Sequence, residues 1–277
     1  MRAYPRAEEV PTVLGEISAD REWFYRAKPV WDKIPQMVPG NSNGYLNAAT
    51  IYWDYYQYDD ALRVLADGRR RLGKPALFGY EAGAIHENRS DIAKALAEYK
   101  AAALLDDDAK SRRRLIRLAR RPQLRDQIEA VTVAAVNDAN VNPAALQLRM
   151  ELLDAQSRRD DLNRLTATLA TRVSSPEMLT LLDQIAREKG FDDVALQVIS
   201  RQVTLSDDPI GKMSLRLRKA RLEESLGRTA AAGATIDALY REYPMSLGIV
   251  RATVDYHWRN QSAPRAVAVL VEASSKA

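Results

Sequence analysis

Apolar residues recur along most of this chain at spacings of three and four positions. The pattern is shown by Leu179, Leu182, Ile185 and Ala186, which fall on one face of a helix. A polar break over residues 188–193 follows, in which Gly190 is suited to end one helix and Asp192 or Asp193 to cap the next. No stretch shows sustained alternation of apolar and polar residues, so the sequence predicts helices and no sheet.

The helical pattern itself repeats. One small or aliphatic position recurs at intervals of 33 to 37 residues, at Ala61, Ala95, Ile128, Leu162, Ala195, Ala232 and Ala266. Such a period is typical of helix-pair repeats, which bury their apolar faces against their neighbours. The longest interval contains residues 206–212, where Pro and Gly mark a loop. The sequence therefore predicts about seven repeats, at 42–75, 76–108, 109–142, 143–175, 176–212, 213–246 and 247–277.

Residues 1–41 are less regular, because several Pro and Gly residues interrupt the apolar pattern. Within them, residues 19–27 and 32–37 are candidates for helices. We expect an N-terminal extension, partly helical, whose Trp23, Phe24 and Trp31 pack on or cap the first repeat. The alternative is the truncated remnant of a preceding repeat.

The repeat resembles the tetratricopeptide repeat (TPR) family over roughly residues 42–275. The matching positions are Ala82 and Gly83 in a first helix, Ala95 and Tyr99 in a second helix, and the series Ala232, Ile236, Leu239 and Pro244. The resemblance implies an all-α, right-handed superhelical solenoid of about seven antiparallel helix pairs. It also implies that the first helix of each pair lines a concave groove, in which such proteins bind other proteins.

Charge is concentrated in the third repeat. The net charge of the chain is +4, but residues 109–125 hold eight Lys and Arg and no acid, so the other 260 residues sum to −4. The side chains expected on the groove face there are Lys110, Arg113, Arg114, Arg117, Arg120 and Arg121. Arg binds carboxylates and phosphates in a bidentate manner, so this stripe is a candidate site for an acidic partner. The alternative is a solvated basic face, partly neutralised by Glu81, Glu87 and residues 106–108.

Aromatic side chains form a second candidate. Trp53 and Asn47 are expected on the groove face of the first repeat, and Trp258 has the same phase in the last repeat. Exposed Trp and Tyr are common anchors for peptides or sugars. The alternative is that the rings pack against the N-terminal extension.

Several chemistries have no support in the sequence. The chain has no Cys, and its two His residues, His86 and His257, occupy a packing phase of the repeat. No nucleotide-binding, serine-hydrolase or zinc-protease motif occurs, so we expect neither catalysis nor a cofactor or metal. Charge is nearly balanced and no aromatic residue interrupts the basic run, so no nucleic acid is expected.

No signal peptide or membrane span is evident in this sequence, so we expect a soluble protein and no membrane insertion, whereas its compartment stays open. The last helix lacks a polar cap, and we therefore expect the chain to be part of a longer one. We interpret it as a non-catalytic protein–protein interaction scaffold that binds a partner segment in its groove. The alternative is a helical-repeat segment of a larger protein that handles polysaccharide or assembles the cell envelope.

Overall fold

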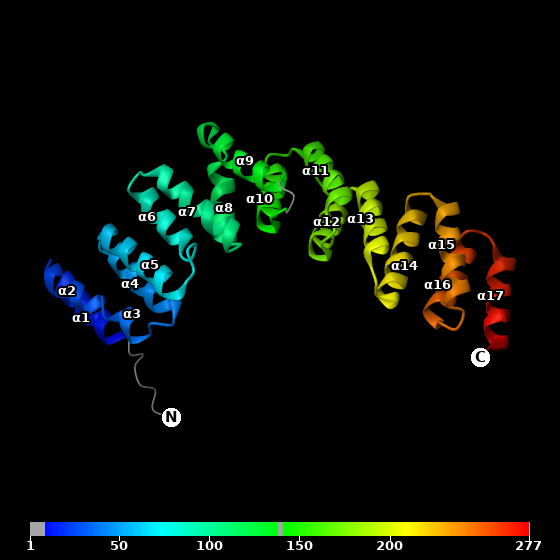
Figure 1. Cartoon of the computed structure of the whole chain (residues 1–277), viewed down its shortest axis with the longest axis horizontal. Coiled ribbons are helices and arrows are strands. Elements are labelled where there is room, and N and C mark those ends of the chain that lie inside the picture. The colour runs from blue at the N-terminus through cyan, green and yellow to red at the C-terminus, as the bar shows by residue number, and fades with distance from the viewer. Residues whose placement is uncertain (1–8, 138–140, 277) are drawn as a thin grey trace, which may run out of the picture. The chain divides into compact units, whose positions relative to one another are not determined.

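The computed structural model describes residues 9–137 and 141–276, and it contains helices and no strand within these ranges (Figure 1). Within each of the two units described below, most helices pack against the next one along the chain. The prediction of an all-α fold built from consecutive helix pairs is thus confirmed. The chain divides into two compact units, an N-terminal unit (Met1–Ala155) and a C-terminal unit (Gln156–Ala277).

The N-terminal unit contains the first ten helices of the described chain. They are α1 (Glu9–Ala19), α2 (Phe24–Trp31), α3 (Ile34–Met37), α4 (Ser42–Asp54), α5 (Tyr58–Leu72), α6 (Gly79–Asn88), α7 (Ile92–Leu105), α8 (Ala109–Leu118), α9 (Pro122–Asn137) and α10 (Pro143–Ala155). Helix α1 packs against α2, α4 against α5, and α6 against α7. Helix α8 packs against α6, α7, α9 and α10, so it is held from several sides.

The C-terminal unit contains seven helices among its described residues. They are α11 (Arg159–Arg172), α12 (Pro176–Lys189), α13 (Asp192–Leu205), α14 (Pro209–Ser225), α15 (Thr229–Glu242), α16 (Leu247–Arg259) and α17 (Ala263–Lys276). Each helix from α12 onward packs against the next one along the chain, and α11 packs against both α12 and α13.

The seven recurring positions identified from the sequence are all buried. Ala61, Ala95, Ile128, Leu162, Ala195, Ala232 and Ala266 are each at most 2% exposed. Five of the seven are Ala, whose small side chain lets a second helix approach its partner closely. Helix α6 shows the same need at Gly83, where a Cβ would lie 2.4 Å from Cε1 of the Tyr99 ring on α7. The recurring positions in the sequence are therefore buried positions of helix packing.

Helix ends follow local sequence signals, with two corrections. Gly190 ends α12 in the left-handed conformation, with φ of 65°, as predicted. Asp192 and Asp193 are not caps, because Phe191 takes the capping position and both acids lie in the first turn of α13. There they favour the helix through its dipole. The loop predicted at 206–212 is also shorter, because Asp208 caps α14 and Pro209 begins it.

The start of the described chain is a helix pair, α1 and α2. The single helix predicted at 19–27 is wrong, since α1 ends at Ala19 and the chain turns at Glu22, whose φ is 61°. The turn brings Trp31 of α2 against Gly15 of α1, where a Cβ would meet the indole at 1.9 Å. Trp23, in contrast, is 39% exposed.

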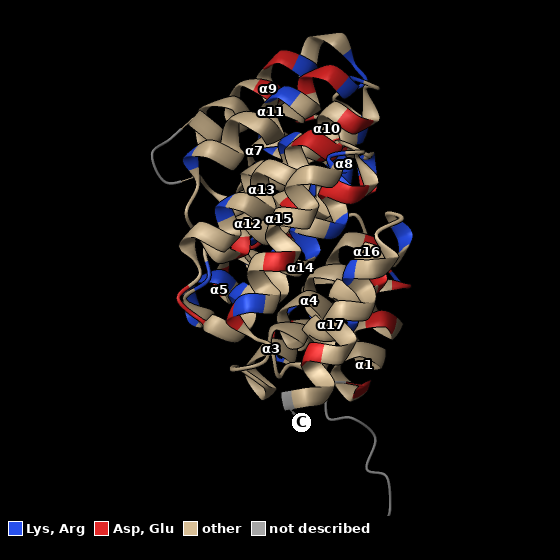
Figure 2. Ribbon diagram, turned by 90° about the vertical axis from the view of Figure 1, so that its right-hand side faces the viewer, with Lys and Arg blue, Asp and Glu red and all other residues tan. Residues whose placement is uncertain are grey.

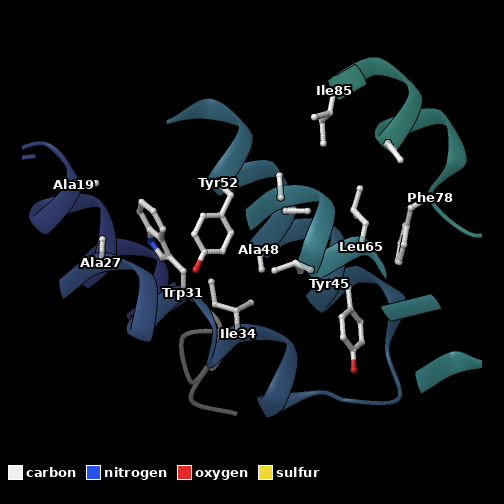
Figure 3. Packing of buried hydrophobic residues seen from close by; sticks show 14 residues of the cluster. Ala19, Ala27, Trp31, Ile34, Tyr45, Ala48, Tyr52, Leu65, Phe78 and Ile85 are labelled. Carbon is white, nitrogen blue, oxygen red and sulfur yellow. The ribbon is translucent and has the colours of Figure 1, made fainter. Parts of the chain in front are cut away.

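Trp31 is central to the core of this region (Figure 3). It is fully buried, and its ring lies 5.2 Å from that of Tyr52 on α4 at an interplanar angle of 85°. The Tyr52 hydroxyl donates to Asp32 over 2.9 Å. Burial of each such ring stabilises the fold by about 1.5–3 kcal/mol.

Ion pairs connect successive helix pairs in the C-terminal unit. Three of them join residues 35 positions apart: Asp183 with Arg218 at 2.8 Å, Asp193 with Arg228 at 2.6 Å, and Glu224 with Arg259 at 2.8 Å. The carboxylate of Asp183 is 5% exposed and also accepts from Arg187 at 3.0 Å. These contacts hold neighbouring helix pairs in a fixed register.

Candidate partner-binding surface

Helix α8 carries the basic run, and its sequence explains how it is oriented. Asp108 precedes it and accepts a hydrogen bond from the backbone N–H of Ser111 at 2.7 Å, which caps the helix. Leu115 and Leu118 are buried against neighbouring helices. Because these apolar residues fix one face inward, side chains on the opposite face point to solvent. Figure 2 shows the Lys and Arg residues of the chain in blue, including those of α8.

Two arginines of the run are parts of the fold. Arg112 is 8% exposed and donates to the backbone carbonyl of Asp107 at 2.8 Å, and it forms ion pairs with the carboxylates of Asp107 and Glu151. Arg114 is half-buried and forms a bidentate pair with Glu87 of α6, with Nε to Oε2 at 2.8 Å. Both contacts tie α8 to its surroundings.

Glu87 is the centre of a small polar network. It also accepts from the Tyr99 hydroxyl at 2.9 Å. Burial alone would raise the pKa of Glu87, but hydrogen bonds from Arg114 and Tyr99 outweigh it and hold that pKa below its ordinary value. The hydrogen bond to Glu87 in turn raises the pKa of Arg114. This carboxylate is therefore ionised at neutral pH and already occupied by Arg114.

Lys110 is also engaged within the fold. Its ammonium lies 3.8 Å from Glu81 and 5.6 Å from the ring centroid of Tyr80, a cation–π distance. The side chain is 61% exposed, so the pair with Glu81 contributes little to stability. The expectation that acids near α8 partly neutralise it agrees with these contacts.

Four further arginines of the run differ from Arg112 and Arg114. Arg113, Arg117, Arg120 and Arg121 are all exposed, and none forms an ion pair or a side-chain hydrogen bond with another described residue. We call these four the arginine face. Arg113 and Arg117 are one helical turn apart, which spaces their side chains by about 6 Å. The structure thus divides the predicted stripe: Lys110 and Arg114 contact acids of α6, and the arginine face is left for solvent or a ligand.

The sequence offered one signal that separates these arginines. Arg112 lies three positions before Leu115 and six before Leu118, which places it on the buried face of the helix. The pairing of Arg114 with Glu87, 27 positions away, gave no such signal, because it depends on how α6 and α8 pack.

The aromatic candidates differ in exposure. Trp53 is partly buried and packs against the cluster around Trp31. Asn47 is exposed on α4 in the N-terminal unit. Trp258 belongs to the C-terminal unit and is 67% exposed, and Tyr56 is 76% exposed. The packing alternative therefore describes Trp53 well and does not describe Trp258.

The two histidines lie in packing positions. His257 is buried, and its Nε2 lies 3.0 Å from Oδ1 of Asp237. His86 is half-buried, and this burial lowers the pKa of its imidazole. Within residues 9–137 and 141–276, no group of three or more His, Cys, Asp or Glu side chains is placed to hold a metal ion. A search of the same residues finds no helix with the length and apolar character that crossing a membrane requires.

Comparison with known proteins adds little to this geometry. No protein-family model matches the chain, and no curated protein matches its sequence. Among solved structures, the chain is similar to a chain in the structure of Naa15/Naa10 bound to HypK-THB, with a TM-score of 0.35 and 14% identity. That match covers 90% of this chain and 38% of the other. A similarity this low decides nothing about function.

Proposed function

We propose that this protein is a non-catalytic interaction scaffold of the tetratricopeptide type that binds an acidic segment of a partner protein at the arginine face. The observation that carries the proposal is the difference between two sets of arginines on α8 and in the turn that follows it. Arg112 and Arg114 take the carboxylates of Asp107, Glu151 and Glu87. The arginine face then presents four exposed cations. Arg121 lies near enough to Glu87 to help lower the pKa of that carboxyl, and Arg113, Arg117 and Arg120 form no ion pair with a described residue.

The chemistry of this surface suits carboxylates. Guanidinium groups pair with carboxylates through two parallel hydrogen bonds, and they lose less hydration on binding than ammonium groups do. Arg113 and Arg117 are spaced by about 6 Å along α8, which matches the distance between alternate side chains of an extended peptide, about 6.6 Å. A segment with Glu or Asp at every second position would therefore meet both arginines.

A charge-reversal experiment tests the proposal. The probe is a fluorescent peptide of alternating Glu and Ser, and binding is measured by fluorescence polarisation at low and at physiological salt. We expect the double variant Arg113→Glu, Arg117→Glu to bind at least tenfold more weakly. The matched control is Arg71→Glu, Lys74→Glu, which makes the same charge change at two exposed cations of the N-terminal unit.

The two variants separate site binding from general attraction. If both weaken binding equally, the peptide responds only to net charge and the arginine face is not a site. Circular dichroism spectra of both variants should match the wild type, because all four substituted side chains are exposed.

A second candidate function rests on the exposed rings. Tyr56 and Trp258 are 76% and 67% exposed, and such rings can stack on the apolar faces of sugars. This supports the alternative of a helical-repeat segment in a polysaccharide-handling protein. A glycan array with the wild type and the Trp258→Ala variant tests it, and the absence of any signal removes this candidate.

A further inference from the structure

Residues 173–175 connect α11 to α12 in the C-terminal unit. The backbone is extended at both ends of this connection, with ψ of 147° at Val173 and 129° at Ser175. The side chains of Ser174 and Ser175 are exposed. An exposed, extended segment is accessible to enzymes that act on protein side chains, because no helix has to unwind before they bind it.

Arg201 of α13 lies beside this connection and lacks a charged partner. It is half-buried, and no carboxylate among the described residues forms an ion pair with it. Its one side-chain hydrogen bond goes from Nη2 to the hydroxyl oxygen of Ser174, at 3.3 Å, which is long for such a bond. The guanidinium therefore has a single, neutral and weak acceptor, at Ser174.

The two serines of the connection have different roles. Ser175 caps α12, because its Oγ accepts from the backbone N–H of Met178 at 3.4 Å and its hydroxyl donates to the carboxylate of Glu177. The hydroxyl of Ser174 caps no helix, and its only contact of this kind with a described residue is the hydrogen bond from Arg201. An anionic group on Ser175 would remove the cap and face a like charge, whereas one on Ser174 would face a cation.

A phosphate group on Ser174 would meet positive potential from two sources. It carries about −1.5 to −2 charges at neutral pH and three acceptor oxygens, so it would give Arg201 the charged acceptor that this residue lacks. The second source is the N-terminus of α12, which begins two residues later at Pro176 and is the positive end of the helix dipole. Glu177 opposes this in part, but its carboxylate is exposed and bonded to Ser175.

We propose that Ser174 is a phosphorylation site and that Arg201 binds its phosphate. A protein kinase transfers the terminal phosphoryl group of a nucleoside triphosphate to Oγ of Ser174. The new O–P bond forms as the bond to the departing nucleoside diphosphate breaks, and the hydroxyl proton passes to the base of the kinase. The phosphate then links α13 to the connection between α11 and α12, two helices that both pack against α13. The site involves none of the residues of the arginine face.

A protein that carries phosphoserine at position 174, incorporated during translation, tests the contact with Arg201 without a kinase. The phosphate is followed by ³¹P nuclear magnetic resonance as the pH is varied. The second pKa of phosphoserine is about 6, and we expect the phosphate on Ser174 to titrate about 0.5 pH units lower or more, because Arg201 favours the dianion. The matched control carries phosphoserine at position 175, beside Glu177, and should show no such decrease.

Variants of the arginine identify the partner of the phosphate. Arg201→Gln should remove at least half of the decrease, and Arg201→Lys should keep more of it because the charge is retained. Arg241→Gln, at an exposed arginine of α15, should change nothing. A phosphate on Ser174 that titrates like free phosphoserine, or a decrease that is unchanged in Arg201→Gln, would overturn the assignment.

Mass spectrometry tests whether the modification occurs. Trypsin cuts after Arg172 and Arg187, so both serines lie in one peptide, residues 173–187. In protein isolated from the cells that naturally produce it, fragment ions should place the phosphate on Ser174. Phosphate on Ser175 alone, or none on this peptide, overturns the proposal. The double variant Arg113→Glu, Arg117→Glu should leave the ³¹P titration unchanged, so this proposal and the proposed function fail independently.

Discussion

Because α6 and α7 approach closely at Gly83, we predict that replacing this Gly by Ala lowers the stability of the protein, whereas helix propensity alone would raise it. Replacing a Gly inside a helix by Ala ordinarily stabilises that helix by about 1 kcal/mol. At Gly83 the added Cβ would lie 2.4 Å from Cε1 of Tyr99, whose ring is 1% exposed and cannot move into solvent. We therefore expect Gly83→Ala to destabilise the protein.

The magnitude follows from the contacts of Tyr99. Carbon atoms pack best at about 3.5–4.0 Å, so the ring has to retreat by about 1 Å. Overpacking of this kind costs about 1–3 kcal/mol. The retreat also strains the 2.9 Å hydrogen bond from Tyr99 to Glu87, which is worth about 1.5–3 kcal/mol with a charged acceptor. After the gain in propensity, the expected net loss is about 2 kcal/mol, or roughly 4–8 °C in Tm for a unit of this size.

The assay is chemical denaturation followed by tryptophan fluorescence in a Trp258→Phe background. The remaining tryptophans, Trp23, Trp31 and Trp53, all lie in the N-terminal unit, so the signal reports the unit that contains Gly83. The control is Gly248→Ala in otherwise wild-type protein, followed by circular dichroism.

Gly248 lies in α16, where an added Cβ meets nothing closer than 4.0 Å, so this variant should be stabilised by about 0.5 kcal/mol. If Gly83→Ala also raises stability, the helix contact does not exclude a side chain and the reasoning is refuted.

Three further predictions concern stability. Trp31→Ala removes a fully buried ring that packs on Tyr52 and should cost about 3–5 kcal/mol, measured as a lower denaturant midpoint by circular dichroism. Asp208→Ala removes the side chain that accepts from two backbone amides at the start of α14, and should cost about 1 kcal/mol in the same measurement; no change would show that the cap is dispensable. The depressed pKa of Glu87 means that its pairing with Arg114 contributes fully above the ordinary glutamate pKa of about 4.3 and is lost as pH falls through the lower folded value. Unfolding free energy should therefore fall more steeply with acid in the wild type than in Glu87→Gln, and parallel pH profiles would contradict this.

Much of the fold could be predicted because the repeat fixes which residues touch. A position such as Ala95 recurs once in each predicted repeat, as Ala in five repeats and as Ile or Leu in the other two, and it is buried in all seven. The left-handed end of α12 was predictable for the same local reason, since Gly190 adopts that conformation without a steric penalty.

The errors arose where a choice between adjacent residues depends on packing. Asp192 and Asp193 were expected to cap α13, but the chain starts that helix one residue earlier and places Phe191 in the capping position, 6% exposed. The turn at Glu22 was also missed, because a positive φ is uncommon for Glu and its sequence gives no sign of it, although local hydrogen bonds from the backbone N–H groups of Glu22 and Trp23 to Ala19 and Ser18 close the turn.

The sequence predicted the candidate site only from its concentration of Lys and Arg. The structure showed which of these side chains are paired with acids and which are exposed. Sequence alone located the basic face on the third repeat, but it could not tell Arg114, which is paired with Glu87, from Arg113, which is exposed. Glu87, the acceptor of Arg114, lies 27 positions away on another helix, and only the packing of α6 and α8 decides that this arginine is paired.

The ion pairs 35 positions apart in the C-terminal unit have a consequence for how this unit unfolds. Each pair couples one helix pair to the next and to no other, so cooperativity passes along the chain by nearest neighbours. Two of the three pairs have a strongly exposed partner and are screened by salt, whereas the carboxylate of Asp183 is 5% exposed and is screened far less. Rising ionic strength should therefore loosen the helix pairs beyond α13 from one another while the junction at Asp183 holds, and hydrogen exchange would show α15–α17 opening before α12.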